Sequence, residues 1–309
     1  YNQMKKECSG TIIDLGGVTI VPGLVNAHCH LKLSKLEGKT TPGQGFVPWL
    51  LSMLANDYRQ TDYDAVEKAV MDAMDQGISC FGDILTTMDT KIADILTKIG
   101  VYHVCFCEAF GFLPIDETEN AIPYGKSEYG AIAGAGHALH TTSPDVLQKI
   151  KKQDQKKGLP FSIHMSEHED ETGMLMGEKT RFYKLLEENN MLGNRYFPPM
   201  KTPVEYGQDL GLLDRSTLAV HCVQVTDNDI EILAKTCTNV CLCPRSNAFI
   251  GVGRAPWEKI LSAKICVSLG TDSIASNYDL NLWNELSYFI RKIDQDLSMS
   301  EAIGLITHN

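Results

Sequence analysis

The sequence feature that most constrains this chain is a pair of histidines, His28 and His30, at the end of a short apolar run. Side chains two residues apart share a face only when the backbone is extended, and they then lie about 7 Å apart along the strand. On a helix the pair would diverge, which separates it from the i, i+4 histidines of helical metal sites. Taken alone, the pair is as consistent with a structural role as with metal binding.

Short β-branched apolar runs alternate with amphipathic stretches, a pattern typical of repeated βα units around a parallel sheet. We expect strands at 19–28, 78–85, 101–110, 131–139, 160–165, 217–223, 238–243 and 265–270. We expect helices at 64–76, 90–99, 143–157, 178–189, 227–235, 257–261, 279–292 and 299–307. Eight alternations predict an α/β fold, a (β/α)8 TIM-like barrel. A doubly wound open sheet is the rival, but the Gly-rich fingerprint that would follow its first strand is missing.

Two parts of the chain fit the barrel pattern less well. Residues 1–20 look like the remnant of a small β-domain, so we expect one domain boundary there and a hydrolase barrel over 21–309. The segment 111–130 is rich in Pro, Gly and acidic residues where a crossover helix is expected. Either that loop is irregular or residues are absent from it. Both ends of the chain look trimmed.

Composition narrows the class of partner. With 309 residues and 43% hydrophobic composition, the chain can bury one large core. A net charge of -11 argues against nucleic acid or an anionic membrane surface as partner and favours a small molecule. No apolar stretch is long enough to span a bilayer and the N-terminus has no signal-peptide pattern, so we expect a cytoplasmic protein. Cys105, Cys107, Cys241 and Cys243 lie in apolar runs and are predicted to be buried, reduced thiols.

Ligand-type side chains recur at the ends of other predicted strands. His164 ends the fifth strand and Asp272 follows the eighth. In a barrel these ends meet at one face, where active sites are built. With His28 and His30 they complete a set of three histidines and one aspartate that leaves room for water, as a catalytic metal requires. Singly, His164 could be a core histidine and Asp272 a helix cap ahead of 279–292.

Two further residues stand beside this set. Glu167, three residues beyond His164, is the candidate general acid and base, although its neighbours 168–171 are predicted to form a solvated acidic loop. His221 ends the sixth strand and is expected to hydrogen-bond the attacking water or the substrate, with a structural role as the alternative. Asp272, besides binding the ion, is expected to accept a proton from that water.

The segments 22–30, 164–167, 221–222, 243–247 and 270–272 together resemble the amidohydrolase superfamily. Within it, the chain resembles the cytosine-deaminase-like group, which includes S-adenosylhomocysteine and methylthioadenosine deaminases, guanine deaminases and triazine hydrolases. Three imidazoles and a carboxylate suit zinc(II) and iron(II) alike, and we expect one divalent ion, zinc(II), with iron(II) as the alternative. The resemblance implies that the protein is often a homodimer. Strand 131–139 lacks the lysine that bridges two metals in binuclear relatives, which implies a mononuclear site.

The resemblance also suggests substrate residues. His137, in the segment 136–143, matches a histidine that contacts ribose in nucleoside deaminases of this branch, whereas Leu139 and His140 replace their usual proline and tyrosine. The segments 243–247 and 270–283 look most like aminodeoxyfutalosine deaminases of menaquinone biosynthesis, which makes 6-amino-6-deoxyfutalosine the leading substrate. The alternative substrates are adenosylhomocysteine, methylthioadenosine and adenosine. A second hypothesis is hydrolysis of an amide or carbon–chlorine bond in another heterocycle. A third is a metal-binding protein without turnover.

Arg245 could bind the benzoate carboxylate of 6-amino-6-deoxyfutalosine. Alternatively, Arg245 forms a surface salt bridge. Four aromatic residues, Phe46, Trp49, Phe110 and Phe112, are candidates for the wall of an aromatic substrate pocket. They are equally consistent with ordinary core positions, and for Phe110 we favour the core.

Overall fold

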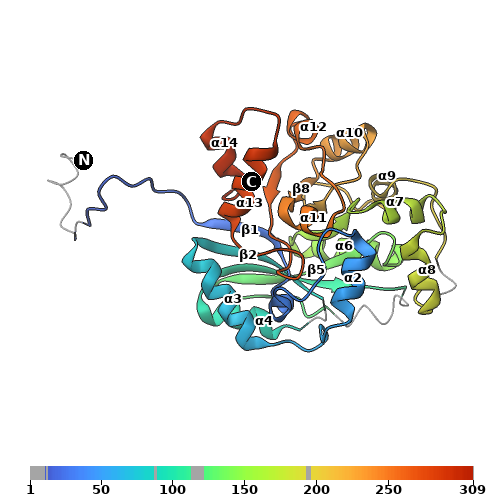
Figure 1. The fold of residues 1–309 in the computed structure, drawn as a ribbon, viewed down its shortest axis with the longest axis horizontal. Coiled ribbons are helices and arrows are strands. Elements are labelled where there is room, and N and C mark those ends of the chain that lie inside the picture. Colours follow the sequence, from blue (N-terminus) through green and yellow to red (C-terminus); the bar gives the residue numbers. More distant parts are fainter. Residues whose placement is uncertain (1–10, 12, 87–88, 113–121, 193–195, 309) are drawn as a thin grey trace.

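The structure is a computed structural model that describes residues 11, 13–86, 89–112, 122–192 and 196–308 (Figure 1). Its strands are β1 Leu24–Cys29, β2 Ile78–Leu85, β3 Tyr102–Ala109, β4 Gly125–Lys126, β5 Gly130–Ala138, β6 Phe161–Met165, β7 Thr217–His221, β8 Asn239–Leu242 and β9 Val267–Leu269. Eight of them run parallel in the order β1-β2-β3-β5-β6-β7-β8-β9, while β4 pairs antiparallel with β5 alone. The predicted TIM-like barrel is confirmed.

The barrel closes between its first and last strands at the end that carries the candidate site. The Asp272 backbone N–H donates to the His28 carbonyl at 3.0 Å. Gly270 permits this approach, because a Cβ at that position would lie 2.8 Å from the same carbonyl oxygen. Beside these strands, the segment 305–306 accepts one backbone N–H from Leu269 of β9 and one from Val25 of β1. Closure therefore places Asp272 directly beside the first histidine of the pair.

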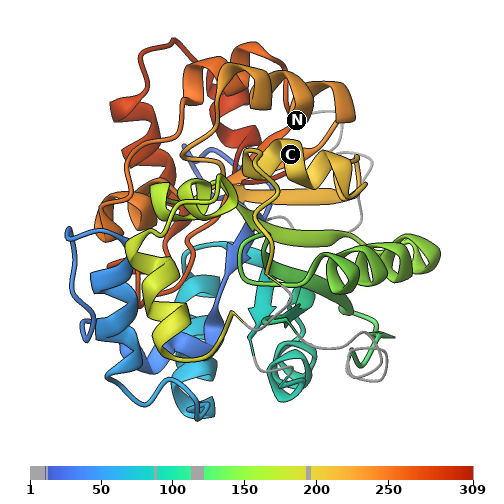
Figure 2. The same cartoon turned by 90° about the vertical axis from the view of Figure 1, so that its right-hand side faces the viewer.

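Helices surround the sheet on its outer side (Figure 2). They are η1 Leu31–Leu36, α2 Phe46–Leu54, α3 Tyr63–Asp75, α4 Lys91–Ile99, α6 Pro144–Lys157, α7 Glu169–Leu175, α8 Arg181–Glu188, α9 Pro203–Asp209, α10 Asp227–Thr236, α11 Pro244–Ile250, α12 Trp257–Ser262, α13 Leu282–Lys292 and α14 Met299–Gly304. Several begin at a side-chain cap, as α10 does at Thr226, whose hydroxyl accepts the Asp229 N–H. The helix α6 ends at Gly158, which adopts a left-handed backbone with φ of 63°.

Over the residues that it describes, the structure contains five helices that were not predicted, η1, α2, α7, α9 and α11, and it differs from the predicted elements in other places as well. The first strand begins at Leu24 rather than Thr19, because residues 19, 20, 22 and 23 are exposed and unpaired in the sheet. The last long helix begins at Leu282, because the Asn281 side chain caps it by accepting two backbone N–H groups. In place of a crossover helix, the described residues 122–129 hold only the short strand β4.

Two predictions concern segments that the structure describes only in part. The loop prediction for 111–130 includes residues 113–121, which lie outside the described residues. The small β-domain expected over 1–20 stays a prediction, since residues 1–10 and 12 also lie outside them. The described residues 13–20 form an extended segment that leaves the barrel ahead of β1 (Figure 1).

The sheet is packed on both sides by buried apolar side chains. Phe81, Phe161 and Leu24 are among the largest that are fully buried. The four cysteines Cys105, Cys107, Cys241 and Cys243 are buried and free, which confirms that prediction. Within the described part of the chain, none of the helices has the length and apolar character needed to cross a membrane.

Candidate active site

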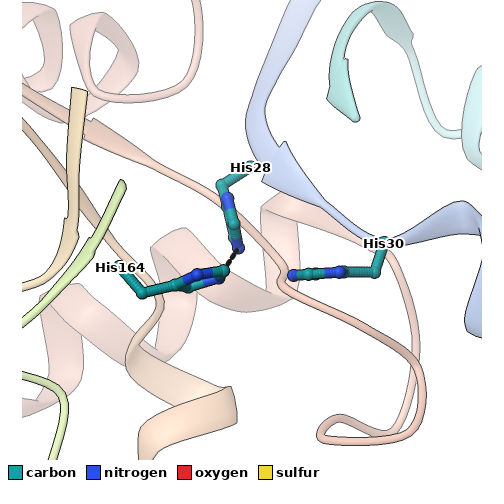
Figure 3. Close-up of side chains that lie close together, drawn as sticks. All are labelled: His28, His30 and His164. Atoms are coloured by element: carbon teal, nitrogen blue, oxygen red, sulfur yellow. Dashed lines mark hydrogen bonds between the residues drawn. The ribbon is translucent and has the colours of Figure 1, made fainter. Parts of the chain in front are cut away.

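Three histidines converge at the carboxyl ends of the strands (Figure 3). His28 lies in β1, His30 follows it directly, and His164 lies in β6. The Nε2 atoms of His28 and His164 are 3.3 Å apart. Asp272 completes the group from the loop after β9, with its Oδ1 at 3.6 Å from His28 Nε2 and 3.4 Å from His30 Nε2. The structure thus brings together all four residues that the sequence suggested as metal ligands.

The four side chains fit a divalent cation. Burial lowers the pKa of His30 to about 3, although Asp272 opposes the shift, and burial with the neighbouring imidazoles holds the pKa of His164 well below its usual range. Neutral imidazoles offer nitrogen lone pairs. Tetrahedral ligands about 2.1 Å from zinc lie about 3.4 Å from one another, close to the spacings found here.

Outer hydrogen bonds fix the orientation of these side chains. The Nδ1 of His164 lies 3.0 Å from the His137 carbonyl, which can only accept, so Nδ1 donates and the Nε2 lone pair faces the cluster. The Asp272 Oδ2 accepts hydrogen bonds from the hydroxyls of Ser246 and Ser276 at 2.6 and 2.8 Å. Its Oδ1 is left to face the histidines.

A buried carboxylate on β2 holds the turn that follows the histidine pair. Asp83 is fully buried, and its Oδ1 accepts the Leu31 N–H at 2.7 Å and lies 3.7 Å from the Cys29 thiol. Burial raises the pKa of Asp83 to about 7, against the lowering effect of the Leu31 hydrogen bond. Sequence reasoning missed this residue. Its position at the end of the second predicted strand, on the edge that carries the histidines, was the available signal.

Glu167 and His221 face each other next to the histidine cluster. Glu167 Oε1 lies 3.8 Å from His221 Nε2, and the His221 ring stacks on the His164 ring at a centroid distance of 5.4 Å. His221 Nδ1 donates to Asn247 Oδ1 at 2.9 Å, which leaves its Nε2 as the acceptor that faces Glu167. Asn247 lies in the segment 243–247 that carried the family resemblance, but sequence reasoning gave it no role.

The pKa values of the two carboxyl groups of the site are shifted in opposite directions. Burial raises the pKa of Glu167 well above its usual range, and the nearby charges of Asp272 and Glu171 add to the shift. Burial also acts to raise the pKa of Asp272, but hydrogen bonding to His28 and the neighbouring imidazoles hold it well below its usual range. The pKa values of the two carboxyl groups are thus shifted in opposite directions, as suits one group that donates a proton and one that accepts it.

His137 lies at the edge of the site. Its ring is half-buried, 5.2 Å from the His164 ring, and its Nδ1 is 2.6 Å from the Thr141 hydroxyl. Phe110 packs edge-on against it at 4.9 Å and is 38% exposed. The preference for Phe110 as a core residue was therefore wrong, because the side chain lies at the rim of the barrel.

Glu108, His137 and His164 form a second group of ligand-type atoms. Glu108 is buried in β3, with its Oε1 at 3.6 Å from His164 Nδ1. That nitrogen already donates to the His137 carbonyl, so it has no lone pair for a cation. The geometry therefore favours a single ion on the Nε2 side of His164.

Two residues considered for substrate binding have protein partners. The Arg245 guanidinium donates to both Asp279 oxygens at 2.6 and 3.0 Å, a bidentate pair. The Trp49 ring is buried, and its Nε1 donates to the Ala275 carbonyl at 2.8 Å. Trp49 packs with Phe46 in a small cluster of apolar residues beside the barrel. Neither polar group is directed at the histidine cluster by these contacts.

The solvated acidic loop predicted at 168–171 was wrong. The segment begins the helix α7, and His168 caps the helix by accepting the Glu171 N–H. Glu171 and His168 are both buried, while Glu169 is exposed. Consecutive acidic residues suggested full exposure to solvent. A helix directs only part of its surface to solvent, so Glu171 points inward.

The chain belongs to the amidohydrolase family, whose sequence pattern it matches over residues 19–309. Among curated relatives, it is 29% identical over 282 residues to a 5'-deoxyadenosine deaminase of Methanothrix thermoacetophila, covering 89% of this chain and 63% of the relative. It is 28% identical to a 5-methylthioadenosine/S-adenosylhomocysteine deaminase of Nitratidesulfovibrio vulgaris, over 90% of this chain and 61% of the relative. The chain thus spans less than two thirds of the length of these relatives.

A solved structure has the same fold. The Helicobacter pylori aminofutalosine deaminase, in complex with methylthio-coformycin, superposes with a TM-score of 0.80 at 21% identity. The superposition covers 92% of this chain and 71% of that one.

Proposed function

We propose that the protein is a metal-dependent hydrolytic deaminase that acts on a 6-aminopurine nucleoside and releases ammonia. The observation that carries the proposal is the pairing of the four-residue ligand cluster with Glu167, a carboxyl group whose pKa is raised well above its usual range by burial. The names of the two curated relatives described above, a 5'-deoxyadenosine deaminase and a 5-methylthioadenosine/S-adenosylhomocysteine deaminase, support the same reaction class.

The residues His28, His30, His164 and Asp272 would hold one divalent ion. When bound, the ion supplies Lewis acidity, which makes a water molecule acidic near neutral pH. Three imidazoles and one carboxylate suit zinc(II) and iron(II), and zinc is our proposal because the ligand set is the open kind found in catalytic zinc sites. Glu108 and His137 stay outside this set.

Asp272 is the proposed base of the reaction. The pKa of its carboxyl group is held well below its usual range, one oxygen accepts from Ser246 and Ser276, and the other faces the ligand cluster, where it would accept a proton from the attacking water. Glu167 is the proposed acid, which would protonate the ring nitrogen beside the amino-bearing carbon. His221, whose Nδ1 donates to Asn247, would accept a hydrogen bond from the attacking water through its Nε2. Asp272 would return its proton to the departing ammonia.

The substrate class we propose is adenosine modified at its 5' position, with His137 at the sugar. Two members lead the class. The likeness of segments 243–247 and 270–283 to aminodeoxyfutalosine deaminases supports 6-amino-6-deoxyfutalosine, and the curated relatives support 5'-deoxyadenosine. Because Arg245 is already paired with Asp279, it does not supply a free cation for the benzoate group of 6-amino-6-deoxyfutalosine. This favours 5'-deoxyadenosine or methylthioadenosine.

The proposal is tested by ammonia release from the zinc-loaded, full-length protein. The panel contains 5'-deoxyadenosine, methylthioadenosine, adenosylhomocysteine, 6-amino-6-deoxyfutalosine, adenosine and guanine. We expect turnover of at least one 5'-modified adenosine with kcat/KM well above that for guanine. Silence on the whole panel by a protein with a full complement of metal would contradict the proposal and direct attention to amide and carbon–chlorine bonds.

A further inference from the structure

A buried polar cluster lies directly behind Glu167. We call it the Glu171 cluster, and its members are Glu171, His168 and His140, each no more than 3% exposed. Four polar atoms in it have no hydrogen-bond partner among the described residues, namely Glu171 Oε1, His168 Nε2 and both ring nitrogens of His140. Burial of an ionisable group without full hydrogen bonding costs free energy, so packing alone does not account for these three residues.

Glu171 directly contacts Glu167, the proposed acid of the reaction. The Glu167 backbone N–H donates to Glu171 Oε2 at 2.8 Å. Backbone hydrogen bonds from Glu167, Ser166 and His168 lower the pKa of the Glu171 carboxyl, although burial dominates and raises it to about 7. A carboxylate that accepts a backbone N–H of a turn holds that turn as a bound anion would. Glu171 therefore closes the turn that carries Glu167.

That turn has an unusual backbone. Ser166 adopts a positive φ of 53°, a left-handed conformation that is uncommon for a residue with a side chain. Such a conformation persists when its surroundings fix it. The Ser166 carbonyl is held by the Gln224 N–H at 2.7 Å, and the N–H side of the turn is held by Glu171. Loss of the carboxylate would release one of these two restraints.

The contact is more than an ordinary helix cap. In a capping box, the glutamate at the third helical position reaches back to the N–H of the capping residue, which here is His168. Glu171 occupies that third position, yet its 2.8 Å bond goes one residue further, to the amide of Glu167. A cap alone would stabilise α7, whereas this bond also constrains the residue that is proposed to donate the proton.

His140 lies on the other side of the carboxylate. Its Nδ1 is 3.8 Å from Glu171 Oε1, and its ring packs edge-on against His168 and Phe182 at 5.3 Å. Phe46 stacks on His168 at 3.8 Å. These rings exclude water from the carboxylate, which strengthens each hydrogen bond that it accepts.

We propose that Glu171 is a positioning residue for the reaction. It holds the turn of Ser166, Glu167 and His168 so that the Glu167 carboxyl group faces the reacting atoms. His140 faces the second carboxylate oxygen of Glu171. The inference rests on the proposed deaminase function. It assigns Glu171 no contact with substrate. Its effect is on the geometry of Glu167, where a displacement of about 1 Å can change a rate by about 100-fold.

The test compares Glu171→Leu, which removes both acceptor oxygens, with Glu171→Gln, which retains one for the Glu167 amide. The exposed Glu169→Leu is the matched control for loss of a charge on the same helix. For Glu171→Leu we expect kcat to fall by about 10- to 100-fold, with KM and metal content unchanged. Glu171→Gln should recover most of kcat and Glu169→Leu should match the wild type. A Glu171→Leu enzyme with unchanged kcat, or one whose loss is not rescued by glutamine, would overturn the inference.

Amide hydrogen exchange at Glu167 separates this inference from the proposed function. We expect slow exchange in the wild type and in Glu171→Gln, and fast exchange in Glu171→Leu, whatever the substrate proves to be. Equal exchange in all three proteins would overturn the positioning role. If the leucine variant does not fold, Glu171→Asp takes its place, because its shorter side chain keeps the charge but withdraws from the amide. An aspartate variant with wild-type kcat and exchange would also contradict the role.

Discussion

The Nε2 atoms of His28 and His164 lie 3.3 Å apart, although 136 residues separate them in the chain. Both rings are buried, and His164 donates through its other nitrogen, so its Nε2 carries a lone pair rather than a proton. Asp272 Oδ1 faces His28 and His30 at 3.6 and 3.4 Å. A divalent cation between these atoms is the arrangement that satisfies all of them at once.

Removal of the metal should therefore destabilise the protein. A ligand that binds only the folded state stabilises it by mass action. We expect chelation to lower the Tm by about 5 °C or more. His164→Asn should have a low metal content and a Tm that no longer responds to the chelator. Differential scanning calorimetry with metal analysis makes the comparison, and a wild-type Tm that chelation leaves unchanged would argue against a bound ion.

Loss of the Asn247 side chain should slow the reaction without emptying the metal site. The Asn247 Oδ1 fixes the orientation of His221 through its 2.9 Å hydrogen bond. For Asn247→Leu we expect kcat to fall by about 10- to 100-fold while the metal content stays unchanged. Steady-state kinetics and metal analysis of the same preparation check this. A variant with normal kcat would show that the orientation of His221 is immaterial.

The protein should lose stability in acid through Asp214. Burial acts to raise the pKa of Asp214, but hydrogen bonds from Lys151 and Ser216 lower it to about 2. A depressed pKa means that the stabilisation is complete above about pH 4, the pKa of the unfolded chain, and is lost as the pH falls toward 2. Urea unfolding from pH 7 to pH 2 measures this loss.

Asp214→Asn is the variant that isolates this contribution. Lys151 is almost fully buried and also bonds Ser216 and Thr217, so its ammonium would lose its only charged hydrogen-bond partner among the described residues. We expect a loss of about 1–3 kcal/mol at pH 7, which shrinks as the pH falls toward 2. A difference between variant and wild type that is constant with pH would contradict the assignment.

The sequence was sufficient for the barrel and for the residues at its carboxyl ends, because both follow local patterns. Apolar runs such as 78–85 match β2 at both ends, and a histidine pair in extended backbone shares a face by geometry alone. The lowered pKa values of His30 and His164, and the 3.3 Å approach of His28 to His164, depend on barrel closure. No local pattern specifies them.

The outer hydrogen bonds could not be predicted, because each joins segments that are distant in sequence. Asp83 and Leu31 are 52 residues apart, and Asn247 and His221 are 26 apart. The buried position of Glu171 was missed for another reason. Its acidic neighbours favoured a solvated loop, whereas the chain forms α7 and directs one of these carboxylates inward.

Arg245 should contribute to stability rather than to recognition of a carboxylate. It bonds Asp279 through its guanidinium and the buried Glu285 through its backbone N–H. For Arg245→Gln we expect a loss of about 1–3 kcal/mol in the free energy of unfolding. The ratio of kcat/KM for 6-amino-6-deoxyfutalosine to that for 5'-deoxyadenosine should not change. A selective loss of the carboxylate-bearing substrate would restore Arg245 as a substrate residue.

The most direct test of the central claim compares the wild type with Glu167→Gln in ammonia release, at matched metal content. Glutamine keeps the shape of the side chain but cannot donate a carboxyl proton to the ring nitrogen. The account predicts that the variant retains its metal and loses activity on the preferred 5'-modified adenosine by about 100- to 10,000-fold in kcat. A metal-replete Glu167→Gln protein that deaminates the nucleoside at the wild-type rate would contradict the account.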